Sequence, residues 1–290
     1  MQWNTSRFQI DLTRPKVMGI VNVTPDSFSD GGQHVSTKAA LQHCEKLIKD
    51  GTDILDIGAE SSRPGAEALP LKQELARLLP VVRVAVKLGV PVSVDTYKPR
   101  VMQAVLDLGA DIINDIWALR WRDQSAAAEP LTAQQVVSRH DTCGICLMHM
   151  HGEPVTMQLS PMLGDVVAQV VLFLKGVAQD LQVQGVSQDR IVIDPGIGFG
   201  KTVAQNFALL AHQSELLEAG YPLLLGWSRK SSLAALSGLA TSSVAWRDWH
   251  EYLVPSVTAA LFALERGASV VRVHDVRETV QAIKVLQAIR

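Results

Sequence analysis

The sequence lacks the features that mark nucleic-acid-binding, membrane-spanning and secreted proteins. Its 27 basic and 29 acidic residues leave a net charge of −2, without a basic stripe or an acidic tail, so neither nucleic acid nor a membrane surface is an expected partner. It has no run of about 18 apolar residues, the length that would cross a bilayer. The first residues lack the basic-then-apolar layout of a signal peptide. We therefore expect a cytoplasmic protein.

Charged residues are also scarce, at 19% of the chain, whereas 47% of the residues are hydrophobic. This balance excludes general disorder and predicts a large buried core. A small anionic substrate stays possible, because a local cluster of Arg, Lys and His does not require a basic protein.

Cysteine is rare as well, and the close pair Cys143 and Cys146 has a spacing found in redox and zinc sites. The pair lies in an apolar run that is typical of a strand, and residues three apart on a strand point to opposite faces. The two sulfur atoms would then not meet. His149 and His151 share a face at the end of the same run, but no third metal ligand stands nearby in the sequence. We expect neither redox chemistry nor a metal centre here.

Apolar, β-rich runs alternate with stretches of helical periodicity along the chain. The predicted strands are 17–24, 53–58, 91–96, 111–116, 144–150, 191–196, 222–228 and 269–275. The predicted helices are 36–50, 72–88, 99–108, a weak one at 131–140, 162–184, 203–217, 250–266 and 277–289. Such alternation indicates a parallel sheet covered by helices, and eight units in this length predict a (β/α)8 TIM barrel. We expect an α/β fold with a single domain over 1–290, the barrel occupying about 17–285.

Polar residues stand where these strands end, which is where TIM-barrel enzymes carry their chemistry. They are Asn22, Asp56, Asp95, Asn114, Asp194, Lys230, Arg272 and His274. Arg272 and His274 are two apart and share one strand face. Facing inward, they would form a cationic pair suited to phosphate; facing outward, they would be a solvated pair at a strand end.

The glycines in DPGIGFGKT at 194–202 suggest a phosphate loop, but a nucleotide P-loop would require glycine at the position of Pro195. A strand-end aspartate before a tight glycine-rich turn suits an acceptor aimed at an N–H-rich ring. Asp26 and Glu60 are a possible carboxylate pair, although both lie in loops where such charges are often solvated.

Eight phrases together resemble the dihydropteroate synthase family. They are NVTPDSFSDGG at 22–32, ESSRPG at 60–65, SVDT at 93–96, INDI at 113–116, LMHM at 147–150, DPGIGFGK at 194–201, SRKS at 228–231 and RVHDV at 272–276. They follow the family's order and cover nearly the whole predicted barrel. The resemblance implies an enzyme that joins 6-hydroxymethyl-7,8-dihydropterin diphosphate to p-aminobenzoate, with Mg²⁺, and releases diphosphate. A homodimer is the family expectation.

The resemblance also implies roles for individual residues. The pterin would be held by Asp95, Asn114, Asp194 and Lys230, with Met148 against the ring. The diphosphate would be held by Asn22, Arg272 and His274, with Asn22 also facing Mg²⁺. The p-aminobenzoate would be framed by Ser62, Arg63, Pro64, Phe199 and Ser228, with loops 26–34 and 61–67 closing over it. Catalytic roles are expected for Lys230, Asp194, Asp26 and Arg63.

Two positions depart from the family pattern: Ser62 replaces a common Thr, and Ala234 replaces a common Gly. Neither removes a charged site residue. Two other functions compete with the synthase. A pterin-binding methyltransferase barrel would not need the complete phosphate set around Lys230 and Arg272. A catalytically silent pterin-binding paralogue would be expected to have lost a diphosphate or loop residue.

Overall fold

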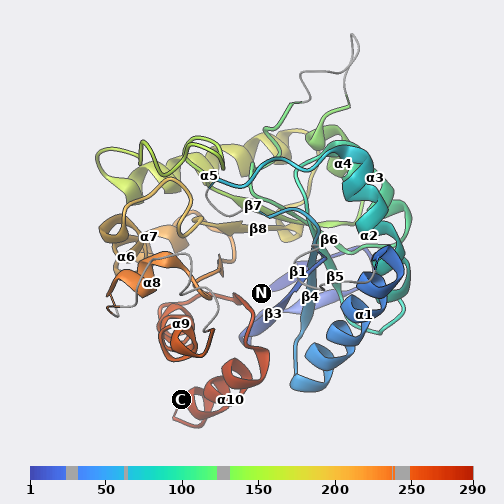
Figure 1. Cartoon of the computed structure of the whole chain (residues 1–290). Coiled ribbons are helices and arrows are strands. Elements are labelled where there is room, and N and C mark those ends of the chain that lie inside the picture. Colours follow the sequence, from blue (N-terminus) through green and yellow to red (C-terminus); the bar gives the residue numbers. More distant parts are fainter. Residues whose placement is uncertain (24–31, 62–64, 123–130, 237, 239–248, 290) are drawn as a thin grey trace.

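The computed structural model confirms the predicted TIM barrel. It describes residues 1–23, 32–61, 65–122, 131–236, 238 and 249–289. The barrel strands are β3 (Lys16–Asn22), β4 (Ile54–Gly58), β5 (Val92–Asp95), β6 (Ile112–Asp115), β7 (Gly144–Met148), β8 (Ile191–Asp194), β9 (Leu224–Leu225) and β10 (Val270–Val273). They gather in the middle of the molecule, and the helices surround them (Figure 1).

The eight strands are parallel neighbours in the order β8-β7-β6-β5-β4-β3-β10-β9. A bridge between Ile193 and Leu223, with the Ile193 N–H donating to the Pro222 carbonyl at 3.0 Å, joins the two ends of the sheet. Apolar side chains that point outward from the strands pack under the helices and form the main core. Because the strands are parallel and the barrel is closed, their carboxyl ends lie together at one rim.

The helices agree with the predicted ones except between β8 and α9. They are α1 (Gly32–Asp50), α2 (Leu71–Ala85), α3 (Pro99–Asp107), α4 (Ala133–Arg139), α5 (Val166–Val183), α6 (Val203–Ala211), α7 (Gln213–Leu217), α8 (Ser231–Leu236), α9 (Trp249–Glu265) and α10 (Val276–Ala288), with a 3-10 turn η2 at Gln188–Arg190. The predicted helix 203–217 is interrupted at His212 and becomes α6 and α7. The weak prediction at 131–140 is confirmed, because Thr132 and Gln135 form a reciprocal capping box at the start of α4.

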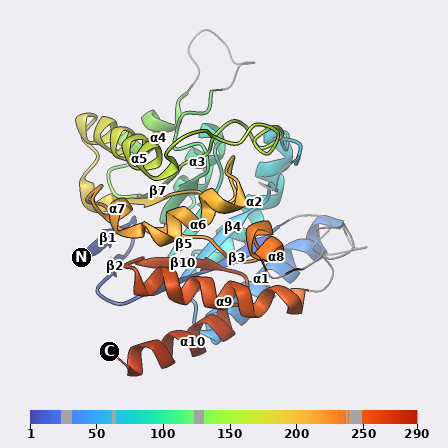
Figure 2. The same cartoon turned by 90° about the vertical axis from the view of Figure 1, so that its left-hand side faces the viewer.

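A hairpin that the sequence patterns did not predict covers the amino-terminal end of the barrel. Strands β1 (Gln2–Asn4) and β2 (Gln9–Asp11) pair antiparallel. Figure 2 shows this hairpin near the amino terminus, and below it the helices α9 and α10 run side by side. Trp3 is fully buried there, and its indole N–H donates to the Arg190 carbonyl at 2.9 Å. It packs with the barrel-interior residues Met18, Ile54, Ile112, Cys146, Val192, Leu224 and Val270. The interior is therefore apolar at this end, and polar groups concentrate at the other.

The two cysteines of the close pair face different sides of the barrel wall, as predicted. Cys146 points into the barrel, Cys143 belongs to the core between barrel and helices, and both are buried free thiols. His149 Nδ1 contacts the ammonium group of the buried Lys201 at 2.9 Å. Among the described residues, no group of three or more His, Cys, Asp or Glu residues could hold a metal ion.

Helix α5 is the only helix, within the described ranges, that is long and apolar enough to cross a membrane by length and composition. Val166, Val170, Leu174 and Leu181 are buried, and the helix packs beside α6 and α7. We therefore interpret α5 as a barrel helix.

Candidate functional site

The candidate site lies inside the barrel at the carboxyl ends of the strands. Strand register places Asp95 of β5 beside Asn114 of β6. It also places Met148 of β7 beside Asp194 of β8. Asn114, Met148 and Asp194 are buried. These side chains form a polar floor above the apolar end of the barrel.

Arg272 on β10 is the centre of this floor. Its Nε donates to Asp56 Oδ2 at 2.6 Å, and its Nη2 donates to Asp95 Oδ2 at 2.8 Å. Asp56 is fully buried and also accepts from the Ser93 hydroxyl at 2.6 Å and from the Asn114 amide at 3.3 Å. The guanidinium group therefore crosses the barrel interior and bridges two carboxylates. Arg272 faces inward, which decides between the two interpretations that its spacing from His274 allowed.

This bridge shapes the protonation of the site. Burial alone would lower the pKa of Arg272, but Asp56 and Asp95 outweigh it and raise that pKa. Burial raises the pKa of Asp95 to about 7, against the opposing effect of Arg272. Asp95 is therefore a carboxyl group that gains or loses a proton readily near neutral pH.

Asp194 and Lys230 form the second polar pair. Asp194 Oδ1 accepts from the Gly196 N–H at 2.7 Å, and burial raises the pKa of Asp194 although that hydrogen bond opposes it. The ammonium of Lys230 lies 4.3 Å from the centre of the Phe199 ring. Burial lowers the pKa of Lys230 to about 8, although Asp194 opposes the shift. The protonation of the Lys230 amine can therefore change with pH or when a ligand binds nearby.

The turn after β8 needs its glycines and is supported by Lys201. Gly196 and Gly200 have positive φ angles, and a Cβ on either would collide with the backbone carbonyls of His149 and His151. The buried Lys201 ammonium binds the carbonyls of Gly196 at 3.0 Å and Phe199 at 3.1 Å. The turn therefore supports Asp194 and Phe199. This agrees with the sequence, which does not match the nucleotide P-loop pattern.

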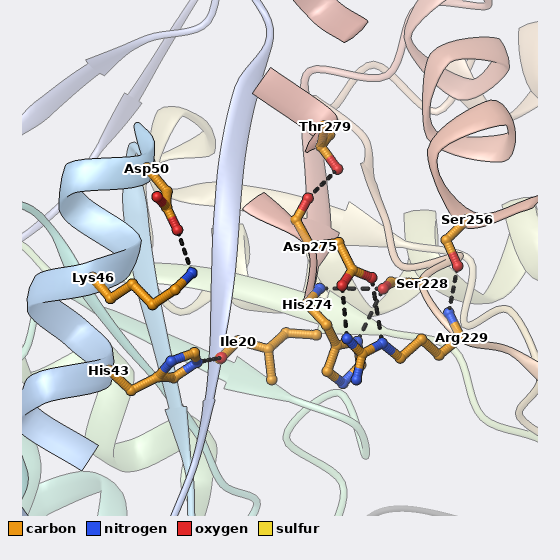
Figure 3. Close-up of polar contacts among 10 residues, drawn as sticks. All are labelled: Ile20, His43, Lys46, Asp50, Ser228, Arg229, Ser256, His274, Asp275 and Thr279. Atoms are coloured by element: carbon orange, nitrogen blue, oxygen red, sulfur yellow. Dashed lines mark hydrogen bonds and ion pairs between the residues drawn. The ribbon is translucent and has the colours of Figure 1, made fainter. Parts of the chain in front are cut away.

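His274 and Ser228 meet at the rim (Figure 3). The Ser228 hydroxyl lies 2.9 Å from His274 Nδ1 and accepts from the His274 backbone N–H at 3.1 Å. Ser228 thereby holds the His274 imidazole at the rim, and either ring nitrogen can carry the proton, because a hydroxyl can donate and accept at the same time.

The structure brings together most of the predicted site residues. The predicted residues that lie in the barrel or at its rim are Asp95, Asn114, Met148, Asp194, Phe199, Ser228, Lys230, Arg272 and His274. Asn22 ends β3 and is exposed. Met148 and Phe199 belong to one buried apolar cluster. Asp26, Ser62, Arg63 and Pro64 lie outside the described residues.

Two acidic residues have roles that the sequence patterns did not assign. Asp56 stands at a strand end, but its pairing with Arg272 depends on a residue 216 positions away. Glu60 is not a solvated loop charge. Its carboxylate accepts from the buried Lys98 ammonium, from the Tyr97 hydroxyl at 2.7 Å and from the Leu69 N–H at 3.1 Å. Neither arrangement is readable from local spacing.

Comparison with known proteins agrees with this site. Residues 18–274 match the family described as pterin binding enzyme. The dihydropteroate synthase of Neisseria meningitidis serogroup B is 45% identical over 292 residues, covering 99% of this chain and 97% of that protein. A Burkholderia cenocepacia dihydropteroate synthase complexed with 7,8-dihydropteroate superimposes with a TM-score of 0.86 at 45% identity, covering 100% of this chain and 96% of that one. The Xanthomonas albilineans enzyme with 4-aminobenzoic acid gives a TM-score of 0.85 at 44% identity, covering 97% and 95% of the two chains. The chain therefore belongs to the dihydropteroate synthase family of pterin-binding enzymes.

Proposed function

We propose that the polar floor of the barrel binds the pterin of 6-hydroxymethyl-7,8-dihydropterin diphosphate and that its rim receives p-aminobenzoate. The products are 7,8-dihydropteroate and diphosphate, in folate biosynthesis. The observation that carries this assignment is the bridge from Arg272 to Asp56 and Asp95, which faces Asp194 and Lys230 inside one closed barrel. The relatives named above favour the synthase over the methyltransferase alternative.

The floor supplies the polar groups that a reduced pterin requires. Such a ring presents a fixed edge of N–H donors with a carbonyl and ring nitrogen acceptors. Asp95 and Asp194 supply acceptors for the donors, and Asn114 and Lys230 supply donors. Because these groups are buried, a ring that left them unpaired would be rejected strongly.

Arg272 and His274 are placed to receive the leaving group. Diphosphate carries developing negative charge as its bond to the pterin methylene breaks. A guanidinium and an imidazole N–H stabilise that charge more than they stabilise the intact substrate, which accelerates departure. Loss of diphosphate leaves a cation delocalised into the pterin, and the aniline nitrogen of p-aminobenzoate attacks it through its lone pair. The protonated nitrogen that results then loses its extra proton to the released diphosphate or to water.

This route needs no dedicated base. Ser228 and His274 are in contact, but the Asp275 carboxylate next to them pairs with Arg229 at 2.7 Å. These residues therefore do not form a nucleophilic Ser–His–Asp triad.

A Mg²⁺ ion fits the donors at the rim. This ion prefers oxygen ligands, and in phosphate sites it takes few ligands from the protein and the others from phosphate oxygens and water. Asn22 offers one amide oxygen at an exposed strand end, on β3 beside the β10 strand that carries Arg272. We propose that Asn22 holds Mg²⁺, which would supply further neutralisation of the diphosphate.

An assay of diphosphate release tests the function directly. With both substrates present, we expect release that requires p-aminobenzoate and falls strongly when Mg²⁺ is removed with a chelator. Excess Mg²⁺ should restore it. Substrate binding without diphosphate release in any condition would identify a silent pterin-binding paralogue. Diphosphate release that is unchanged by the chelator would contradict the proposed role of Mg²⁺.

We also propose that the chain is one barrel domain that works as a cytoplasmic homodimer through α9. Val254 and Phe262 lie two helical turns apart on its outer side and are 71% and 44% exposed. We expect Phe262→Glu to shift the protein towards monomers in sedimentation velocity. Leu172→Glu, at another exposed apolar position on α5, is the control. A wild-type monomer, or an equal effect of both variants, would contradict this surface.

A further inference from the structure

Arg229, between the site residues Ser228 and Lys230, has an unusual backbone. Its φ is +58°, and only two other non-glycine residues in the described part of the chain, Ala118 and Leu119, have positive φ angles. L-residues avoid this left-handed region unless the surrounding structure holds them there. Such residues are concentrated at functional sites, where the backbone conformation directs neighbouring side chains.

The left-handed residue determines where its two neighbours point. The chain makes a tight turn here, with the Lys230 N–H donating to the Trp227 carbonyl at 3.2 Å. On one side of Arg229, the Ser228 hydroxyl meets His274. On the other side, the Lys230 ammonium reaches over the Phe199 ring. Both neighbours therefore point into the site, while the Arg229 side chain goes elsewhere.

The Arg229 side chain runs to the junction of β10 and α10 (Figure 3). Its Nη2 donates to Asp275 Oδ1 at 2.7 Å, and its Nε lies 3.3 Å from Asp275 Oδ2. The Arg229 backbone N–H donates to the Ser256 hydroxyl of α9 at 3.0 Å. Arg229, the residue of this turn with the strained backbone, therefore ties the turn both to the start of α10 and to α9.

Asp275 is itself firmly placed. It is 7% exposed, and its backbone carbonyl accepts from the Thr279 hydroxyl at 2.8 Å. It occupies the N-cap position of α10, where an aspartate normally binds the first N–H groups of the helix. Its side chain makes no such cap hydrogen bond in the described helix. The carboxylate is turned towards the Arg229 guanidinium instead.

We propose that Arg229 and Asp275 are positioning residues for the synthase reaction, which hold the 227–230 turn so that Ser228 and Lys230 face the substrates. The proposal rests on the proposed function. The pair does not touch the reacting atoms. It acts by holding Lys230 over the Phe199 ring and Ser228 against His274. His274 lies just after β10 and directly precedes Asp275, so the ion pair is anchored next to the residue that Ser228 contacts.

The test compares Arg229→Met and Asp275→Asn with a matched ion pair at the opposite end of the barrel. Arg7 pairs with Asp111 at 2.5 Å, with side chains 34% and 0% exposed, against 30% and 6% for Arg229 and Asp275. Arg7→Met therefore removes a similar charge pair far from the site. Each variant is assayed for kcat and for the KM of both substrates, and its thermal unfolding is followed.

We expect Arg229→Met and Asp275→Asn each to lower kcat/KM by at least about 10-fold. The double variant should have a kcat/KM no lower than that of the less active single variant, because both changes break the same ion pair. Arg229→Lys should recover part of the activity. Arg7→Met should lower the unfolding temperature and leave the kinetics unchanged. Losses of stability with unchanged kinetics in Arg229→Met, Asp275→Asn and the double variant, as in Arg7→Met, would overturn the proposal.

The pH profile separates positioning from a general loss of structure. Lys230, deep in the site near Asp194, Arg272 and Asp95, has its pKa lowered to about 8. A loosened turn would let Lys230 reach water, so the alkaline limb of kcat/KM should move up by about half a unit or more in Arg229→Met. It should stay in place in Arg7→Met.

If Arg229→Met does not fold, Ser256→Ala replaces it, because that change removes only the hydroxyl that accepts from the Arg229 N–H. A shift of the alkaline limb in Ser256→Ala would support the proposal, and an unchanged profile would overturn it. An inactive wild-type protein would contradict the proposed function instead, so the two failures are distinguishable.

Discussion

Lys230→Ala and Asp194→Ala are each expected to lower kcat/KM by at least about 100-fold, equivalent to about 2.7 kcal/mol of transition-state stabilisation. Asp194 ends β8, and Lys230 lies in the turn after β9, so both stand at the carboxyl rim where we propose that the pterin binds. Asp194 is 6% exposed and Lys230 is its neighbouring cation. Removing either one takes away an opposite charge that opposes the effect of burial on the pKa of its partner.

Steady-state kinetics with both substrates measure this effect. Lys16→Ala is a suitable control, because Lys16 begins β3 at the amino-terminal end of the barrel and pairs only loosely with Asp53, at 3.7 Å. It should behave as the wild type. Near-normal turnover in a folded Lys230→Ala or Asp194→Ala protein would remove that residue from the pterin site.

The same pair sets the expected pH dependence. The pKa of Lys230 is lowered to about 8, so its ammonium is lost as the pH rises through that value, and activity should decline on the alkaline side. Asp194 has a raised pKa, and burial raises the pKa of Asp95 to about 7, so both carboxylates are protonated earlier than usual as the pH falls. Activity should therefore be greatest in the narrow range between Asp95 and Lys230, at about pH 7 to 8.

The barrel was predictable from the sequence because its strands are continuous apolar runs and its helices end at recognisable signals. The amino-terminal hairpin was not. Its strands β1 and β2 have three residues each, too short for a pattern, and polar residues flank the buried Trp3 and Ile10. Trp3 is fixed by a carbonyl 187 positions along the chain. Contacts of that range leave no local signal.

The site shows the same division. Strand-end position alone identifies Asp95, Asn114 and Asp194 as candidates. It does not show that Arg272 is shared between Asp56 and Asp95, since β10, the last strand, comes near β4 and β5 only through its pairing with β3, the first barrel strand. The left-handed backbone of Arg229 is also hidden, because the turn has a bulky residue where a sequence pattern would call for glycine.

Arg272→Met is expected to weaken binding of the pterin as well as of diphosphate. The strand spacing of Arg272 and His274 alone suggests a purely anionic role, in which an unphosphorylated pterin would bind normally. The structure predicts otherwise, because the variant leaves Asp56 and Asp95 facing each other without a counter-ion. Breaking a buried pair in this way costs about 3–5 kcal/mol. Part of that cost would be avoided by protonation of Asp95, whose pKa is already raised.

Calorimetric titration of diphosphate and of the unphosphorylated pterin measures the two effects separately. We expect both affinities to fall by at least about 10-fold, since a charged hydrogen bond is worth about 1.5–3 kcal/mol. Arg272→Lys should not restore pterin binding, because one ammonium cannot reproduce the two N–H groups that a guanidinium directs to two different carboxylates. His274→Gln is the matched control, since it changes the anion site without touching Asp56 or Asp95, and it should weaken diphosphate alone. If Arg272→Met also weakened diphosphate alone, the bridge would serve only to place a cation for the leaving group, and the pterin would be held without Asp95.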